Sequence, residues 1–229
     1  MSPKRYFVTG TGTGVGKTFV TCELARLARE RGLQVIAHKP IETGCPMVDG
    51  KRRGSDQALL RMASSPWLQQ VDDDAVQFGG YQLELPLAPS VAAAHEKVEI
   101  DMLWIERILG RASVTPREEP VDLFLVEGAG GWRVPISDRY EMRDLARMVA
   151  TTTQRKTVIV VASATLGTIN HSLLTVKAVE EDELGVAALV LSNRPEDSLA
   201  MVQSNIDEIR KRWPGRILMI DQLDQLLPS

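Results

Sequence analysis

The sequence predicts an α/β fold in which a mostly parallel sheet carries helices on both faces. Short runs rich in valine, isoleucine and leucine recur along the chain, and segments with helical spacing lie between them. Continuous apolar runs of this length are typical of strands buried on both faces, as in a parallel sheet. The chain has 229 residues, which is enough for one sizeable hydrophobic core. No low-complexity linker divides it, so we expect residues 1–229 to form a single domain.

Six of the apolar runs are predicted as strands. Most of them do not alternate apolar with polar residues, and this pattern favours strands that are buried on both faces over strands with one solvent-exposed face. The predicted strands cover residues 6–9, 34–38, 123–126, 158–162, 186–191 and 217–220.

Six further segments are predicted as helices. The first carries Val20, Leu24, Leu27 and Ala28 at helical spacing and ends at Gly32, a common helix-stop residue. Three polar or proline-containing stretches, residues 44–53, 79–89 and 111–120, are expected as loops, and such loops often carry function. The predicted helices cover residues 19–31, 56–63, 100–109, 143–150, 172–181 and 199–213.

The composition argues against several classes of protein. With 27 basic and 30 acidic residues and 44% apolar residues, the chain is not expected to be disordered. Its net charge of −3 provides no general attraction to nucleic acid or to an anionic membrane. The longest purely apolar run, residues 186–191, is far shorter than the about 20 residues of a membrane-spanning helix. Cys22 and Cys45 have neither a disulfide framework nor zinc-ligand spacing, so we expect a soluble, cytoplasmic protein.

The most informative motif is residues 10–18, which read GTGTGVGKT between the first predicted strand and the first predicted helix. This is the context that a phosphate-binding loop requires. Backbone N–H groups of the glycines can point at an anion, and the helix N-terminus adds positive charge. Lys17 is expected to reach the β- and γ-phosphates of a nucleotide, and the Thr18 hydroxyl to coordinate Mg²⁺. The fold class is therefore that of a P-loop NTPase-like domain.

The spacing of this motif separates it from similar ones. Counted from Gly10, it fits G-x5-G-K-T, one residue longer than the standard G-x4-G-K-T. A dinucleotide-binding G-x-G-x-x-G does not fit, because its third glycine would fall on Val15 or on Lys17. A GTPase is not favoured, since no Asn-Lys-x-Asp element occurs. A glycine-rich turn without a ligand is the alternative interpretation.

Polar residues follow the apolar runs at several strand ends. Lys39 follows the second predicted strand, Glu127 the third, and Ser192 and Asn193 the fifth. In open parallel sheets, ligands bind beyond the carboxyl ends of the strands. A buried lysine or glutamate is costly unless it is paired, so Lys39 and Glu127 are expected beside an anionic ligand and a cation; simple exposure at a loop start is the alternative.

Two further features belong with these strand ends. Residues 128–131, which follow Glu127, read GAGG and allow a ligand to approach the backbone closely. Asp56 opens a predicted helix behind Gly54 and Ser55. Asp56 is either a functional acid or an ordinary N-terminal acid that the helix dipole favours.

These motifs together resemble the dethiobiotin synthetase family over about residues 5–195. The blocks VEGAGG and LGTINH, in combination with the phosphate-binding loop, make the resemblance specific. The matching segments are residues 6–10 (YFVTG) with the loop, 39–40 (KP), 43–44 (TG), 55–56 (SD), 86–93 (PLAPSVAA), 126–132 (VEGAGGW) and 166–175 (LGTINHSLLT).

The resemblance implies an enzyme of biotin biosynthesis, a cyclo-ligase that forms C–N bonds and acts as a homodimer. Its substrates would be 7,8-diaminononanoate, CO2 and ATP with Mg²⁺, and its products dethiobiotin, ADP and phosphate. One amine takes up CO2 as a carbamate, the γ-phosphate transfers to the carbamate to form a carbamic–phosphoric anhydride, and the second amine closes the ring. No nucleic-acid or membrane partner is implied.

The resemblance also assigns roles to individual residues. Lys39, Lys17 and Thr13 are implied as catalytic. Thr18, Asp56 and Glu127 are implied as Mg²⁺ ligands. Thr43, Gly167 and Asn170 are implied in substrate binding, the last two across the dimer interface. The implied nucleotide-binding residues are Gly14, Val15, Gly16, Lys17, Thr18, Phe19, Asp56, Glu127, Gly128, Ala129, Gly130, Asn193 and Arg194.

Two departures and two alternatives accompany the resemblance. Family members often have Asp at the position of Gly12, and many have a Gly-Glu-Ile-Pro-like segment on the adenine where residues 217–223 here read ILMIDQL, so base preference stays open. A partition or division-site ATPase is the alternative from another class, but its signature lysine would stand where Gly12 is. A synthetase-like fold without activity is the third interpretation.

Overall fold

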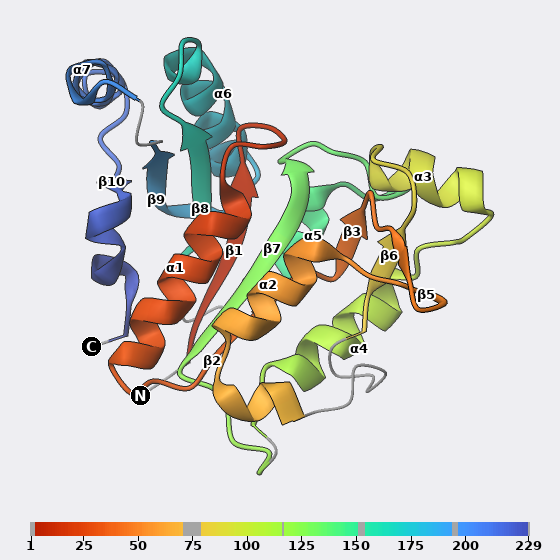
Figure 1. Ribbon diagram of the computed structural model, residues 1–229. Helices are drawn as coiled ribbons and strands as arrows, with labels where there is room; N and C mark the ends of the chain where they lie inside the picture. Colours follow the sequence, from red (N-terminus) through yellow and green to blue (C-terminus); the bar gives the residue numbers. More distant parts are fainter. Residues whose placement is uncertain (1–2, 71–78, 116, 151–153, 194–196, 229) are drawn as a thin grey trace.

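Six strands form one parallel sheet in the order β10-β9-β8-β1-β7-β2 in the computed structural model of the protein (Figure 1). The structure describes residues 3–70, 79–115, 117–150, 154–193 and 197–228. The expected α/β fold with a parallel sheet is confirmed. The strands are β1 (Lys4–Gly10), β2 (Val35–His38), β7 (Leu123–Gly131), β8 (Lys156–Ser163), β9 (Gly185–Ser192) and β10 (Ile217–Met219).

Helices cover both faces of this sheet, as the alternating pattern predicts. One face packs against α1 (Lys17–Glu30), α2 (Ser55–Ala63) and the C-terminal 3-10 helix η2 (Ile220–Leu226). The other face packs against α4 (Met102–Ala112), α5 (Met142–Val149), α6 (Thr168–Glu181) and α7 (Leu199–Arg210). Among the described residues, no helix has the length and apolar character needed to cross a membrane.

Strand β7 extends further than its apolar run predicts. The predicted strand ends at residue 126, whereas the observed one continues through Glu127 and the glycines to Gly131. Gly131 pairs with Gly10 in the parallel register that β1 and β7 share. Glycine is depleted in strands, so the sequence pattern ends where the apolar residues end. The extension places the carboxyl half of β7 alongside the phosphate-binding loop.

Short elements occur where the sequence predicts only loops. Residues 44–53 hold a two-stranded hairpin, β4 (Met47–Val48) with β5 (Lys51–Arg52). Residues 79–89 hold β6 (Tyr81–Leu83), which pairs in parallel with β3 (Ile41–Thr43). Helix α3 (Pro89–Glu96) and the 3-10 helix η1 (Pro66–Gln70) lie in stretches for which the sequence predicts no helix or strand. Strands of two or three residues are too short for periodicity to reveal them, which is why the prediction of loops alone over residues 44–53 and 79–89 was wrong.

Each predicted helix is found, but with one or both boundaries shifted by one to four residues; α4, for example, spans Met102–Ala112 rather than residues 100–109. Helix α6 begins at Thr168, four residues earlier than the predicted start at residue 172, directly after Gly167 in the left-handed region (φ +95°). Helix α7 ends at Arg210 rather than at residue 213. Helix ends depend on local caps more than on apolar spacing, so the spacing locates the helix and not its boundary.

Trp132, which follows the glycines of β7, is a packing residue. Its ring meets Phe7 of β1 edge-on, with ring centroids 6.3 Å apart. Its indole N–H donates to the Asp182 carboxylate at the end of α6, at 2.8 Å. Buried tryptophan N–H groups normally find such a partner. The residue therefore ties the end of β7 to β1 and α6.

Candidate functional site

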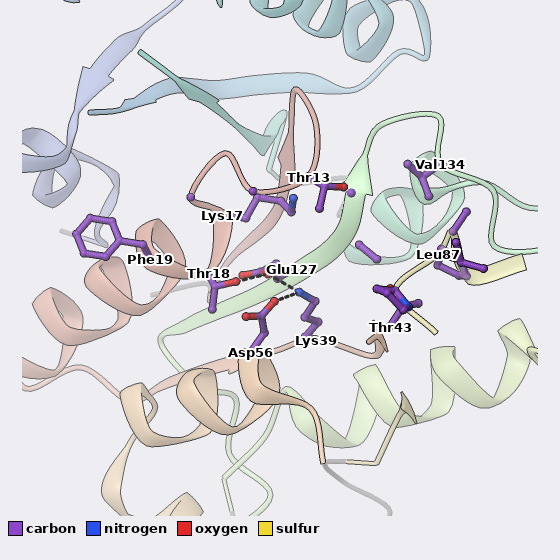
Figure 2. A pocket seen from close by; sticks show the side chains of 17 residues that line it. Thr13, Lys17, Thr18, Phe19, Lys39, Thr43, Asp56, Leu87, Glu127 and Val134 are labelled. Carbon is purple, nitrogen blue, oxygen red and sulfur yellow. Dashed lines mark hydrogen bonds and ion pairs between the residues drawn. The ribbon is translucent and has the colours of Figure 1, made fainter. Parts of the chain in front are cut away.

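A cavity of about 740 Å³ lies at the carboxyl ends of β1, β2 and β7 (Figure 2). Its volume is typical of a site for a small molecule. The phosphate-binding loop and the start of α1 form one wall, and Lys39, Asp56 and Glu127 converge in its floor. It is lined by Thr13, Gly14, Gly16, Lys17, Thr18, Phe19, Lys39, Thr43, Asp56, Pro86, Leu87, Ala88, Pro89, Glu127, Ala129, Gly130 and Val134.

The phosphate-binding loop turns sharply into helix α1. Gly16 has a φ of +96°, a left-handed conformation that favours glycine. A side chain at this position would also collide with Ser192 at the end of β9. Lys17 begins the helix, and its Nζ donates to the carbonyl oxygen of Gly12 at 3.0 Å. Burial lowers the pKa of Lys17 to about 8, an effect that the charge of Glu127 partly opposes.

A cluster of opposite charges occupies the floor of the cavity. Glu127 is fully buried; one of its oxygens accepts hydrogen bonds from Thr18 Oγ1 at 2.9 Å and from Lys39 Nζ at 3.0 Å. Lys39 also forms an ion pair with Asp56. Burial by itself would lower the pKa of Lys39, but Glu127 and Asp56 together raise it above its ordinary value. Lys39 therefore stays a cation, held between two carboxylates.

The donor set fits a magnesium ion. Thr18 contributes a hydroxyl, and Asp56 and Glu127 contribute carboxylates, all hard oxygen donors. Mg²⁺ in proteins commonly takes one or two carboxylates and completes its shell with water and substrate phosphates. These residue types, beside a loop built for phosphates, therefore suit Mg²⁺ accompanied by a nucleotide.

Two buried residues of the site are not apparent from the sequence motifs. Thr21, one turn after Thr18, shares its single O–H between two acceptors, the Lys17 carbonyl at 2.8 Å and the other Glu127 oxygen at 3.1 Å. Glu42 on β3 accepts the backbone N–H groups of Asp56 and Gln57, each at 2.9 Å. Spacing i, i+3 puts Thr18 and Thr21 on one helix face, a signal that could have revealed Thr21. Glu42 has no comparable local signal.

An apolar wall faces the charged floor. The segment that leads from β6 into the first residue of α3 supplies Pro86, Leu87, Ala88 and Pro89, and Val134 closes the same side (Figure 2). The sequence resemblance includes residues 86–93 but assigns them no role. Apolar side chains over a few polar groups are the usual construction of a small-molecule site.

Most of the residues singled out from the sequence line this cavity, and some do not. Val15 packs instead against the hydrophobic cluster on the α1 face, and Gly128 lies against the ring of Phe7. Asn193 follows Ser192 beyond β9 and is not among the lining residues. Arg194 lies outside the described residues.

Gly167 and Asn170 lie at the start of α6, away from the lining of the cavity. Both are exposed, as is Leu166 immediately before them. Within one copy of the chain, these two residues are therefore not brought to the charged cluster.

Comparison with known proteins places the chain in a family. A family model described as an AAA domain matches residues 4–226. The ATP-dependent dethiobiotin synthetase BioD of Aromatoleum aromaticum is 37% identical over 216 residues, which cover 94% of this chain and 89% of that protein. The protein of the same name from Thermodesulfovibrio yellowstonii is 40% identical over 194 residues, covering 82% of this chain and 75% of that protein.

The chain belongs to the dethiobiotin synthetase family. This membership confirms the resemblance drawn from the motifs and sets aside the partition-ATPase alternative. Among solved structures, the signal recognition particle receptor FtsY from Elizabethkingia anophelis matches with a TM-score of 0.56 at 16% identity. That match covers 94% of this dethiobiotin synthetase-family chain but 57% of the FtsY chain, and at such identity it shows a shared P-loop fold alone.

Proposed function

We propose that this protein catalyses the ATP-dependent closure of a cyclic urea, in which 7,8-diaminononanoate, CO2 and ATP give dethiobiotin, ADP and phosphate. The observation that carries the proposal is the meeting of Lys39, Asp56, Glu127 and Thr18 beside the phosphate-binding loop in one cavity. Phosphoryl transfer needs alignment and charge neutralisation more than covalent help, and this cavity offers both.

The nucleotide half of the site uses the loop and the start of α1. Backbone N–H groups of Gly14, Val15 and Gly16, together with Thr13 and Lys17, hold the phosphates. Thr18, Asp56 and Glu127 hold Mg²⁺, which when bound neutralises charge on the phosphate oxygens. Phe19 is half-exposed at the cavity mouth, and Ala129 and Gly130 line the far side. Asn193, which follows β9, contacts the base.

The substrate half uses Lys39 and Thr43. The carbamate forms on one amine of the diamine, and its oxygen attacks the γ-phosphorus while ADP leaves. The ammonium of Lys39 lies between the two reactants and stabilises the negative charge that is shared during the transfer. The second amine then attacks the carbonyl carbon and phosphate leaves with the former carbamate oxygen. Thr43 lines the cavity and offers its hydroxyl to the diamine or carbamate.

The remaining substrate contact involves a second copy of the chain. Gly167 is the N-cap residue of helix α6 and Asn170 lies in its first turn, and the N-terminal N–H groups of this helix suit the carboxylate of the diamine. They are flanked by Leu166, which is 99% exposed, and by Leu174, which is 60% exposed. Large exposed apolar side chains next to a binding segment are typical of protein–protein contacts. A homodimer therefore brings the α6 start of one protomer to the cavity of its partner.

The test is an assay of phosphate release with the diamine and bicarbonate present together, with each omitted, and with other nucleoside triphosphates in place of ATP. We expect release only when both are present, together with a product whose mass is that of the cyclic urea. Glu208→Gln on the exposed side of α7 serves as a matched control and should behave as the unaltered chain. Phosphate release that is independent of the diamine would contradict the proposal.

A further inference from the structure

Helix α2 begins without a capping side chain of its own. Its N-cap residue is Gly54, which has no side chain to accept hydrogen bonds from the first turn. The first N–H groups of a helix have no partner within the helix and need an acceptor from elsewhere. Asp56 lies in this first turn and contributes its carboxylate to the cavity floor. The position of Asp56 therefore depends on how the helix start is held.

Glu42 of strand β3 provides the missing acceptor. Its Oε1 accepts the backbone N–H of Asp56, and its Oε2 accepts that of Gln57, each at 2.9 Å. These are the second and third residues of the helix, whose N–H groups an N-cap side chain normally satisfies. A Cβ placed on Gly54 would overlap the Glu42 carboxylate. The carboxylate thus occupies the place that a local capping side chain would fill.

The same carboxylate links two elements that border the cavity, strand β3 and the start of helix α2. Glu42 is buried, follows Lys39 by three residues and directly precedes Thr43. Through its two hydrogen bonds it joins β3, which carries the cavity residue Thr43, to the helix start that carries Asp56. A negative charge at a helix N-terminus is favourable, so the cap is electrostatically stable as well as geometrically complete.

We propose that Glu42 is a positioning residue, whose carboxylate caps α2 from β3 and thereby fixes the Asp56 carboxylate where a divalent cation binds beside the nucleotide. The inference rests on the proposed function, which assigns Asp56 as a ligand of that cation. Glu42 itself acts through Asp56 and does not touch the cation or the reacting groups.

The first test measures Mn²⁺ binding to the full chain by electron paramagnetic resonance, in the presence of a non-hydrolysable ATP analogue. Groups that orient a metal-ligating carboxylate typically strengthen the metal's binding by about tenfold or more, so Glu42→Ala should weaken Mn²⁺ binding by about tenfold. Affinity for the analogue without metal should change by less than about twofold, because the phosphate-binding loop is not altered. Glu84→Gln removes another negative charge without contact to α2 and is the matched control.

The second test moves the cap to the helix itself. In the double variant Glu42→Ala/Gly54→Ser, the space left by the carboxylate admits a serine, which is a favoured N-cap residue. We expect this double variant to recover most of the Mn²⁺ affinity and the slow hydrogen exchange of the Asp56 and Gln57 amides. Gly54→Ser alone should bind Mn²⁺ less tightly than the unaltered chain, because its side chain collides with Glu42.

Two results would overturn the inference. One is Mn²⁺ binding by Glu42→Ala, or by Glu42→Gln should the alanine variant not fold, that equals binding by the unaltered chain. The other is a folded double variant whose amides are again protected but whose Mn²⁺ affinity stays low. Since Mn²⁺ binding is measured without turnover, an unaltered chain that lacks diamine-dependent phosphate release would contradict the proposed function alone.

Discussion

Lys39 is a buried lysine, and burying its charge destabilises the folded state unless opposite charges lie next to it. Its side chain is 7% exposed and contacts Asp56 and Glu127, so each of the three charged groups depends on the others. Removing one partner of a buried ion pair leaves an uncompensated charge. The resulting loss of stability is far larger than the net stability that the intact pair contributes. Changes at this cluster should therefore affect stability as well as activity.

Lys39→Ala is expected to lower turnover by about a thousandfold, since the charge it stabilises develops mainly in the transition state. Nucleotide affinity should change little because the phosphate-binding loop remains. Without Mg²⁺, the free energy of unfolding should also fall by about 3 kcal/mol, as two neighbouring carboxylates lose their cation. Single-turnover kinetics and chemical unfolding measure these effects. Lys211→Ala, at an exposed position just after α7, is the control. Turnover by Lys39→Ala that equals that of the unaltered chain would refute the role.

Asp56→Asn and Glu127→Gln should each raise the Mg²⁺ concentration for half-maximal activity by about tenfold, because each removes a charged oxygen ligand. Asp207→Asn, on an exposed part of α7, should leave the requirement unchanged. Mg²⁺ titrations of initial rates measure the effect. Unchanged titrations for both active-site variants would show that the cation binds elsewhere.

The lowered pKa of His38, the last residue of β2, predicts that stability depends on pH. Burial lowers its pKa from 6.5 to about 4, although a hydrogen bond with the Gly79 backbone opposes the shift. Between these values, the unfolded chain binds a proton at His38 and the folded chain does not, so stability decreases as the pH falls below 6.5. The unfolding temperature should drop from pH 7 to pH 5, and His38→Gln should reduce that drop. An equal drop in His38→Gln and in the exposed control His171→Gln would contradict this.

At the level of single elements, two serines that follow α2 accept hydrogen bonds from backbone N–H groups on the free edge of strand β2. Ser65 Oγ accepts the Val35 N–H at 2.8 Å, and Ser64 Oγ accepts the Ala37 N–H at 2.9 Å. Unpaired N–H groups on an edge strand invite pairing with another chain. The serine hydroxyls therefore pair these N–H groups within the chain. They also attach the end of α2 to β2, the strand that leads to Lys39.

Ser64→Ala should therefore lower the free energy of unfolding by about 1–3 kcal/mol, because a buried N–H loses its acceptor. Urea unfolding measures the change, and Ser198→Ala is a control because the exposed Ser198 makes no side-chain capping hydrogen bond. A loss no larger than that of the control would show that water replaces the hydroxyl at this edge.

At the scale of the whole molecule, the proposed site draws on two copies of the chain. Lys39 lies in the cavity of one protomer, whereas the exposed Asn170, in the first turn of α6, does not line that cavity. If the partner supplies Asn170, a protomer that lacks Lys39 and one that lacks Asn170 can together build one intact site per heterodimer.

Mixing Lys39→Ala with Asn170→Ala after co-refolding should therefore restore activity to about a quarter of the unaltered level, because half of the dimers are mixed and each has one intact site of two. Each variant alone should be nearly inactive. An affinity tag on one variant, with recovery of the untagged variant alongside it, establishes that mixed dimers form. Mixed dimers without recovered activity would place Asn170 and Lys39 in different sites or in the same protomer.

Local patterns were sufficient for the fold class, the phosphate-binding loop and the residues at strand ends. Apolar runs identify buried strands, and a parallel sheet necessarily brings its carboxyl ends to one edge, so Lys39 and Glu127 could be predicted to converge. Lengths were predicted less well. Strand β7 continues through glycines, and the paired β3 and β6 are too short to show a period.

Short-range spacing and the geometry common to parallel sheets were therefore enough to predict the sheet, the nucleotide loop and the types of polar side chain gathered beside that loop. The folded chain was needed to see that Lys39 pairs with Asp56, that Glu42 caps the helix that carries Asp56, and that residues 86–89 form the opposite wall. These arrangements depend on contacts between segments brought together by folding, and no local spacing encodes which side chain will meet which.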